Sequence, residues 1–312
     1  MYIFSNVIGV FVFDDKFDVV DETLFKEIGG YKSRENLIEK IRDKHKNLKE
    51  LDEKALKSIL LHFKNRKYFN NFYSQNIQLT KIDVKNSVTN DILIIHSIKL
   101  VDELDKAINL LIKKLREWYE LHNPEFSVAV QNHEKFVEEI LEKEKSELLN
   151  QLKINPNDSM GADLGQEDTE PIKSLAHQIY DLYQLKKEQL NYISTLMDEI
   201  CQNIKAVCGV AVAAKLIERA GSLKRLSEMP ASTIQILGAE TALFRHLKTG
   251  AKPPRHGVIV HHPLIAQAPN KMHGKIARTL ADKISIAVKV DYFQGKFIGD
   301  KLRKELEKKF EK

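Results

Sequence analysis

The feature that most constrains the fold is a long run of apolar residues, spaced three and four apart, in the middle of the chain. The run consists of Ile172, Leu175, Ile179, Leu182, Lys186, Leu190, Ile193, Met197, Ile200 and Ile204, with Lys186 as its polar interruption. This spacing predicts an amphipathic helix with an a/d seam. Glu170 and Pro171, in its first turn, are both favoured at that position. The seam needs a second apolar surface to cover it.

A second helix, predicted from about Glu125 to Leu152, offers such a surface. Between the two helices lies the segment KINPNDSMGADLGQEDTEP, which is rich in turn-forming residues. Two helices joined by one short loop run antiparallel, which predicts a coiled-coil hairpin over residues 120–204, with each helix ~45 Å long. An ordinary bundle inside a compact domain is the alternative. The charged outer faces favour a projecting arm instead.

Apolar residues at the tip of this hairpin indicate self-association. Met160 and Leu164 have no obvious core to enter, so a second arm could cover them. We therefore expect a homodimer formed through the coiled coil, with Ile179, Leu182 and Ile193 of the seam taking part.

The first part of the chain has the pattern of a small α/β module. Residues 2–4 and 7–13 are rich in β-forming residues, and Asn76 to Asp83 also resembles a strand. Helices are predicted at residues 33–43 and 52–63, with Asp52 as an N-cap. A long helix follows from about Asp91 to His122 and ends before Pro124.

The C-terminal third is predicted to be all-α, with helices at residues 271–290 and 299–310. The whole chain is therefore expected to be α+β but mostly helical. We expect three domains: a small α/β domain over residues 1–119, the hairpin over 120–204, and the helical domain over 205–312.

The net charge of +5 hides a strong asymmetry along the chain. Residues 205–312 hold 21 Lys and Arg against 9 Asp and Glu, whereas residues 120–204 hold 7 against 17. A basic last third behind an acidic middle indicates a polyanionic partner for the last third alone. No apolar run approaches the roughly 20 residues that span a bilayer. The start of the chain resembles no secretion signal, so a cytoplasmic protein is expected.

The most informative stretch for binding is a basic segment with an irregular connection. Gly250, Pro253, Pro254 and Gly257 make it stiff and non-helical. Its candidate phosphate-contacting residues are Arg245, His246, Lys248, Lys252, Arg255 and His256. Guanidinium, ammonium and imidazole donors on a stiff loop suit phosphate contacts. A second basic set, Lys271, Lys275 and Arg278, falls at helical spacing, where a solvated helix face is the plain alternative.

Motifs for catalysis are missing from the sequence. There is no P-loop, because Ile276 occupies the hydroxyl position in HGKIAR, and there is neither a G-x-S-x-G elbow nor a G-x-G-x-x-G turn after a strand. Histidines 256, 261, 262 and 273 could in principle bind zinc, but no supporting motif accompanies them. Cys201 and Cys208 are interpreted as small buried hydrophobic residues rather than a redox or metal pair.

Several of these stretches resemble one known family. The segment ASTIQILGAETALFRHLKTGAKPPRHGVIVHHPLI is similar to the signature of the Nop-domain proteins, and the fit continues through KIARTLADKISIAVKVDYF. Upstream, LREWYELHNPE and SMGADLGQEDTEPIKSLA resemble the archaeal members. The likeness runs from about Asp91 to the end of the chain, and the end itself lacks the Lys/Glu tail of eukaryotic nucleolar members.

The resemblance implies a scaffold rather than an enzyme. Such proteins form the core of box C/D particles, which methylate RNA on ribose 2′-hydroxyls under the control of a guide RNA. It implies that the N-terminal domain binds fibrillarin, which holds S-adenosylmethionine, so no cofactor is expected on this chain. The coiled coil would self-associate, and the C-terminal domain would grip kink-turn RNA together with a small kink-turn-binding protein. Carried over residue by residue, the RNA-facing positions are Arg245, His246, Lys252, Arg255 and His256.

The sequence departs from the family pattern at two positions. Thr241 and Glu228 stand where many members have lysine, which removes cations near the expected RNA surface. Either RNA binding is weaker, or neighbouring Lys224 or Arg225 compensates. A spliceosomal Nop-domain paralogue on a different kink-turn RNA is the first alternative. An enzyme acting on RNA by itself is the second, and it would need a catalytic cluster that the sequence does not offer.

Overall fold

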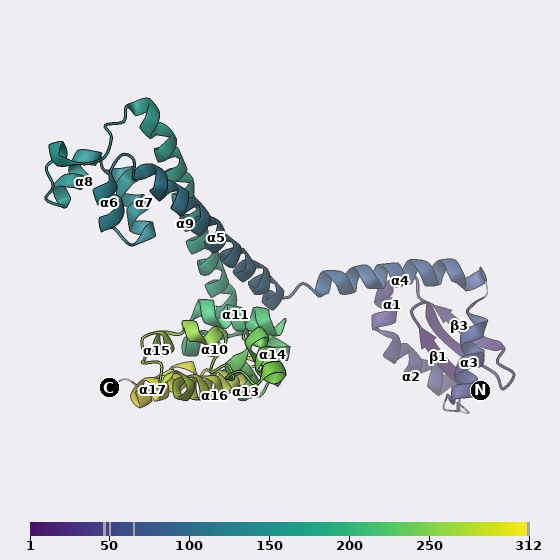
Figure 1. Cartoon of the computed structure of the whole chain (residues 1–312). Helices are drawn as coiled ribbons and strands as arrows, with labels where there is room; N and C mark the ends of the chain where they lie inside the picture. Colours follow the sequence, from purple (N-terminus) through teal and green to yellow (C-terminus); the bar gives the residue numbers. More distant parts are fainter. Residues whose placement is uncertain (46–47, 50, 65, 311–312) are drawn as a thin grey trace. The chain divides into compact units, whose positions relative to one another are not determined.

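The computed structural model describes residues 1–45, 48–49, 51–64 and 66–310, and the chain divides into two compact units, residues 1–89 and 90–312 (Figure 1). Within its described residues, the first unit contains three strands and four helices. They are β1 (Tyr2–Asn6), β2 (Gly9–Phe13), β3 (Val19–Leu24), α1 (Ile28–Lys32), α2 (Arg34–Lys44), α3 (Glu53–His62) and α4 (Arg66–Asn86). Within the described ranges, no helix of either unit combines the length and apolarity needed to cross a bilayer.

The first unit is built around an antiparallel sheet in the order β1-β2-β3. All five residues of the central strand β2 are buried. Because neighbouring residues of a strand point to opposite faces, Phe11 and Phe13 pack with Ile59 and Tyr68 on one face, while Val10 and Val12 pack with Ile41 on the other. The sheet therefore has helices on both faces, which confirms the expected small α/β module.

The strand predicted from Asn76 to Asp83 is wrong, because these residues lie inside helix α4. Leu79, Ile82 and Val84 alternate only weakly, whereas the segment continues a helix that starts at Arg66. The sheet's third strand is instead β3, which the sequence reading did not single out. The predicted N-cap is confirmed: the Asp52 side chain accepts a hydrogen bond from the Ala55 backbone N–H at 2.7 Å.

The second unit begins with an arm made of two long helices, α5 (Asn90–Tyr119) and α9 (Gln166–Ile200), which pack side by side (Figure 1). Ile94 and Ile98 of α5 share a core with Ile193 of α9, whereas Ile112 shares another with Ile179. The start of one helix thus meets the end of the other, so the pair is antiparallel. The long antiparallel helical pair is confirmed.

The partner of α9 in this pair differs from the predicted one. The prediction of a single helix from Glu125 to Leu152 is wrong. The segment forms three short helices instead: α6 (Pro124–Ala129), α7 (His133–Glu142) and α8 (Lys145–Gln151). Asn123 caps α6 through Phe126 N–H, and Asn132 caps α7 through Lys135 N–H. The first cap begins α6 after α5 ends, the second separates α6 from α7, and α8 begins after Glu144 without a side-chain cap. The three pieces pack around the distal ends of α5 and α9.

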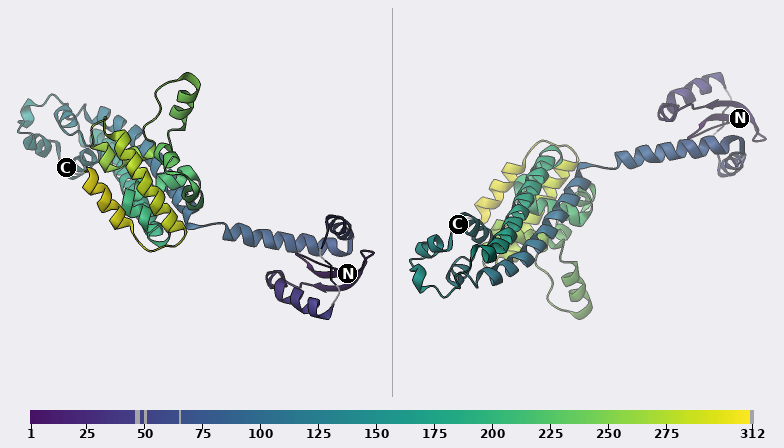
Figure 2. Two further views of the ribbon diagram at one scale, coloured as in Figure 1. Left: turned by 90° about the horizontal axis from the view of Figure 1, so that it is seen from below. Right: turned by 90° about the horizontal axis from the view of Figure 1, so that it is seen from above.

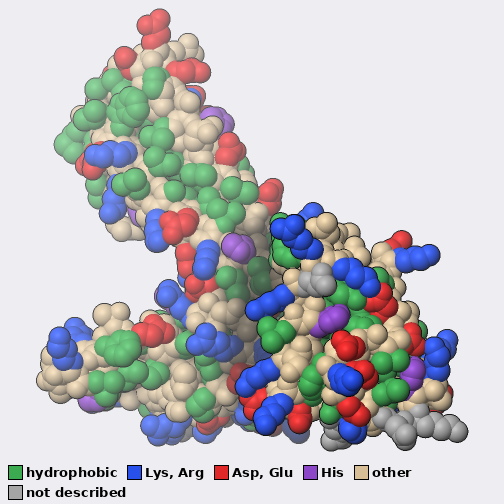
Figure 3. All heavy atoms as spheres, turned by 90° about the vertical axis from the view of Figure 1, so that its right-hand side faces the viewer, with side chains coloured by type: hydrophobic (Ala, Val, Ile, Leu, Met, Phe, Trp, Pro, Cys, Tyr) green, Lys and Arg blue, Asp and Glu red, His purple; other side chains and the backbone are tan. Residues whose placement is uncertain are grey.

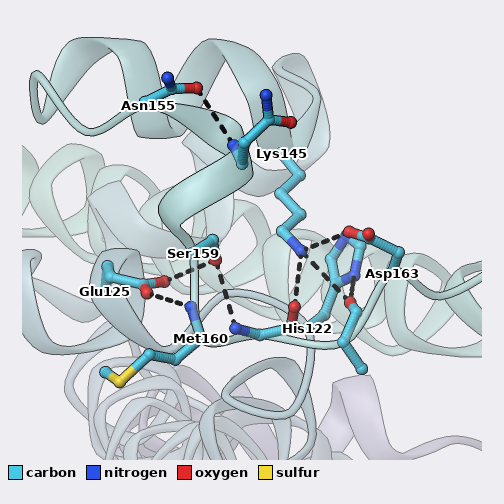
Figure 4. Close-up of polar contacts among 10 residues, drawn as sticks. His122, Glu125, Lys145, Asn155, Ser159, Met160 and Asp163 are labelled. Carbon is cyan, nitrogen blue, oxygen red and sulfur yellow. Dashed lines mark hydrogen bonds and ion pairs between the residues drawn. The ribbon is translucent and has the colours of Figure 1, made fainter.

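The tip loop that follows α8, which includes the 3₁₀ turn η1 (Pro156–Asp158), is held by polar contacts (Figure 4). The Glu125 carboxylate accepts hydrogen bonds from Ser159 Oγ at 3.0 Å and Met160 N–H at 2.7 Å. The Lys145 ammonium donates to Gly161 O and pairs with Asp163 at 2.9 Å. The loop therefore holds Met160 outward, with 84% of its surface exposed.

The rest of the second unit is all helical, which confirms the predicted C-terminal fold. Its elements are α10 (Gln202–Cys208), α11 (Val210–Ala220), α12 (Leu223–Glu228), α13 (Ala231–Ile236), α14 (Glu240–Thr249), η2 (Val258–His261), α15 (Pro263–Ala266), α16 (His273–Tyr292) and α17 (Gly299–Phe310). One core joins these helices, except α14, to the base of the arm. Asp291 of α16 accepts from Asn203 N–H at 3.0 Å and Ile204 N–H at 2.9 Å, which ties α16 to the start of α10.

Candidate nucleic-acid interface

Helix α14 stands off from the other C-terminal helices (Figure 2). None of its residues is buried, and the apolar side chains of Phe244 and Leu247 are 67% and 70% exposed. Gly238, with φ of 88°, precedes the helix, and Gly250, with φ of 69°, ends it in the left-handed region that glycine tolerates best. The helix is thus attached at both ends and covered by nothing in the described chain.

The connection after α14 is fixed at its far end, although it is irregular. Gly257 N–H donates to Gln235 O at 2.9 Å, Val258 N–H donates to Leu237 O at 2.8 Å, and the Gln235 amide donates to Arg255 O at 2.7 Å. A Cβ on Gly257 would lie 1.9 Å from Leu237 O, so only glycine fits there. We call residues 250–257 the connector. Its close apposition to the turn after α13 positions Arg255 and His256.

The predicted RNA-contacting cations lie on the surface of this region. Arg245 and Lys248 on α14 and Lys252 and Arg255 in the connector are exposed. Arg255 Nη1 donates to Asn270 O at 2.9 Å, which brings the connector next to Lys271 at the start of the second basic set. Lys252 makes no hydrogen bond or ion pair within the described part of the chain, and its ammonium is available to a ligand.

The two histidines of the set are half-buried and do different work. The imidazole of His246 contacts the carbonyl of Ala251 and so closes the turn after α14. The ring of His256 lies 5.5 Å from that of His273. Burial, with smaller contributions from His273 and Arg255, lowers the pKa of His256 below its ordinary value. His256 is therefore neutral near pH 7 and suits hydrogen bonding or stacking better than charge neutralisation.

The remaining sequence-predicted cations lie in two groups, one near the start of α16 and one on α12. Lys271, Lys275 and Arg278 are exposed around the start of α16, and Lys224 and Arg225 are exposed on α12. The connector lies next to Lys271, because Arg255 is hydrogen-bonded to the carbonyl of the preceding residue, Asn270. The roles of Gln235 and Gly257 in fixing the connector were missed, since they depend on a turn that no local sequence pattern reveals.

The three residues expected at a self-association seam lie on α9. Ile179 and Ile193 have no exposed surface within the single chain, and Leu182 is half-buried, so their first role is to pack α9 within the arm. Exposed hydrophobic side chains gather instead around the distal end of the arm (Figure 3). They include Leu110, Leu121, Val128 and Met160.

The histidines considered for zinc do not form a metal centre. In the described residues, no group of three or more His, Cys, Asp or Glu side chains could hold a metal ion. His261 is exposed, whereas His262 is buried with its Nε2 3.2 Å from Val207 O. His262 is therefore structural.

Comparison with known proteins gives a family match over most of the chain. The family model described as "Nop: snoRNA binding domain, fibrillarin" matches residues 100–312. An uncharacterized NOP5 family protein of Methanocaldococcus jannaschii is 42% identical over 266 residues, covering 78% of this chain and 64% of that protein. Nucleolar protein 58 of Candida albicans is 40% identical over 217 residues, covering 65% of this chain and 42% of that protein.

The chain thus spans about two fifths to two thirds of the length of these curated relatives. Among solved structures, a chain of a fibrillarin/Nop5p complex is similar over 99% of this chain and 98% of its own length, with a TM-score of 0.45 and 23% sequence identity.

Proposed function

This chain belongs to the Nop family, and on that premise we propose that it is a non-catalytic scaffold of a box C/D guide particle that directs ribose 2′-O-methylation of RNA. In this role the C-terminal helical domain, residues 205–312, binds kink-turn RNA together with a kink-turn-binding protein. The N-terminal unit, residues 1–89, binds fibrillarin, and the arm built from α5 and α9 joins two copies. The family description, which names both snoRNA binding and fibrillarin, supports the RNA-binding and fibrillarin-binding roles.

One observation carries the RNA-binding role: exposed cations sit on a connector whose backbone is fixed by the chain itself. Lys252 and Arg255 are exposed, while Gly257 and Val258 are hydrogen-bonded to the turn after α13. A fixed backbone limits the entropy lost when a phosphate binds. The adjacent helix α14 adds Arg245 and Lys248 and offers a protein partner an uncovered apolar face in Phe244 and Leu247.

The test measures the salt dependence of RNA binding for a connector variant. We expect Lys252→Ala to weaken binding to kink-turn RNA and to lower the slope of log K against log salt by about 0.7 to 0.9, the value for one lost phosphate contact. Lys304→Ala, an exposed cation on α17, is the matched control and should leave the slope unchanged. Equal slopes for Lys252→Ala and the unaltered chain would show that the Lys252 side chain of the connector does not contact a phosphate, and would contradict the proposed RNA interface.

The non-catalytic role has its own test. Purified chain is incubated with guide and target RNA and labelled S-adenosylmethionine, first alone and then with fibrillarin. We expect methyl transfer only when fibrillarin is present. Transfer by the chain alone would overturn the scaffold proposal.

A further inference from the structure

A polar cleft lies directly beside the connector, between it and helix α11. The cleft has a volume of about 340 Å³. Lys215, Glu218 and Arg219 line it from one face of α11, and Asp102 lines it from α5. The opposite wall consists of connector and η2 residues, His256, Gly257, Val258, Val260 and His261, with Gly238 and Ala239 between the walls.

The charges in this cleft differ from those on the connector. Lys215 Nζ pairs with Asp102 at 2.7 Å, and Arg219 Nε pairs with Glu218 at 3.2 Å. The side chain of Glu218 is only 18% exposed, so its carboxylate forms part of the wall. Two carboxylates offset the two cations. A phosphate, which the connector attracts, therefore gains no net attraction in the cleft, since Asp102 and Glu218 balance Lys215 and Arg219.

The same groups are well suited to a nucleobase. Carboxylates accept hydrogen bonds from base N–H groups, and guanidinium and ammonium groups donate to base oxygens and ring nitrogens. Imidazole rings such as the exposed His261 and the neutral His256 provide surfaces for stacking. Proteins recognise RNA sequence chiefly through unpaired bases that are turned out, stacked and contacted along their edges.

We propose that the α11 cleft binds an unpaired base of the RNA whose phosphates lie on the connector. The proposal rests on the proposed function, since it places the backbone of the same RNA at Lys252 and Arg255. The polarity of the two surfaces then orients the nucleotide. Its phosphate lies outside on the connector, and its base lies inside the cleft against Glu218 and Arg219. The site adds recognition of an unpaired nucleotide to backbone binding.

The decisive variant is Glu218→Ala, measured in the full chain with kink-turn RNA. If Glu218 acted through charge alone, removing it would free Arg219 and tighten RNA binding. If its carboxylate accepts from a base, the variant weakens binding by about tenfold, as for one lost base contact. His261→Ala changes an exposed side chain and keeps the fold intact, and it should also weaken binding.

A second measurement locates the base. Kink-turn RNAs are made with an abasic site at each unpaired position in turn. We expect one of these RNAs to bind the unaltered chain and Glu218→Ala equally, whereas the others preserve the difference. The salt slope of Glu218→Ala should equal that of the unaltered chain.

The outcomes separate this inference from the proposed function. Unchanged or tighter binding by Glu218→Ala, or a difference that persists with every abasic RNA, overturns the base site. In that case a lowered salt slope for Lys252→Ala would still support RNA binding by the connector. Normal slopes and affinities for both variants would overturn the proposed RNA interface and the base site together.

Discussion

At the scale of single residues, the buried imidazole of His262 makes the C-terminal helices sensitive to acid. Its Nδ1 accepts from Leu264 N–H at 3.2 Å, and its Nε2 faces Val207 O, which requires the neutral ring with its proton on Nε2. Burial, which is the main cause, lowers the pKa of His262 below its ordinary value near 6.5. The unfolded chain therefore takes up a proton at a higher pH than the folded chain.

We expect this difference to appear as a loss of stability on acidification. The contribution of neutral His262 is complete above about pH 6.5 and is lost as the pH falls towards the lowered pKa. The free energy of unfolding in urea, compared at about pH 7.5 and pH 5.5, should fall less for His262→Gln than for the unaltered chain. His261→Gln, at the exposed neighbouring position, should retain the original pH dependence. An unaltered pH dependence in His262→Gln would assign the acid sensitivity to other groups.

Residue identity alone predicted which cationic side chains of α14 and the connector face solvent. Exposed Arg245, Lys248, Lys252 and Arg255 agree with the expectation, because charged side chains stay hydrated unless they are paired. The lowered pKa of His256 could not be predicted, since it follows from burial and from His273, which lies beyond η2 and α15 in the sequence. Spacing in the sequence carries no information on such burial.

At the scale of helices, the arm depends on apolar contacts between α5 and α9. Ile179 is fully buried against this seam, and Ile179→Ala should lower the free energy of unfolding of the second unit by about 2 to 4 kcal/mol. Leu110→Ala, on α5 but 67% exposed, is the matched control and should change it by less than about 0.5 kcal/mol. Urea unfolding followed by circular dichroism gives both values. Equal losses would contradict the assigned packing.

The apolar period identified α9 correctly but not its partner. Both α5 and the segment from Glu125 to Leu152 offer apolar residues at helical spacing, so periodicity could not choose between them. The choice is made by breaks in that segment: the Asn132 side chain caps α7, and α8 begins anew after Glu144. The Asn123 cap separates the segment from α5. Lys186, which interrupts the apolar seam, pairs with Asp105 of α5. That pairing becomes intelligible only once α5 is known to be the partner.

At the scale of the whole molecule, the chain consists of two units, each with its own hydrophobic core. The aromatic core around Phe11 and Phe13 belongs to residues 1–89, whereas the helical cores belong to residues 90–312. The sequence predicted both kinds of core from strand and helix periods. It did not reveal that α5 packs within the second unit, because that depends on contacts with α9 and α11.

This division predicts that the proposed partners separate between fragments. We expect residues 1–89 to capture fibrillarin in a pull-down, and residues 90–312 to shift kink-turn RNA with the affinity of the whole chain. Each fragment should show a cooperative unfolding transition, since each retains its own core. If residues 90–312 retained fibrillarin in the absence of residues 1–89, the proposed assignment of fibrillarin to the first unit would be wrong.

Helix α14 buries none of its residues, so its sequence does not have to satisfy both folding and binding, as most protein surfaces do. Substitutions at Phe244, Arg245 or Leu247 take no atoms from the core, so the chain can lose or change an interaction there and still fold. Selection can therefore act on this helix through what it binds alone. Its sequence is free to follow the evolution of another macromolecule while the remaining helices stay under the restraint of folding.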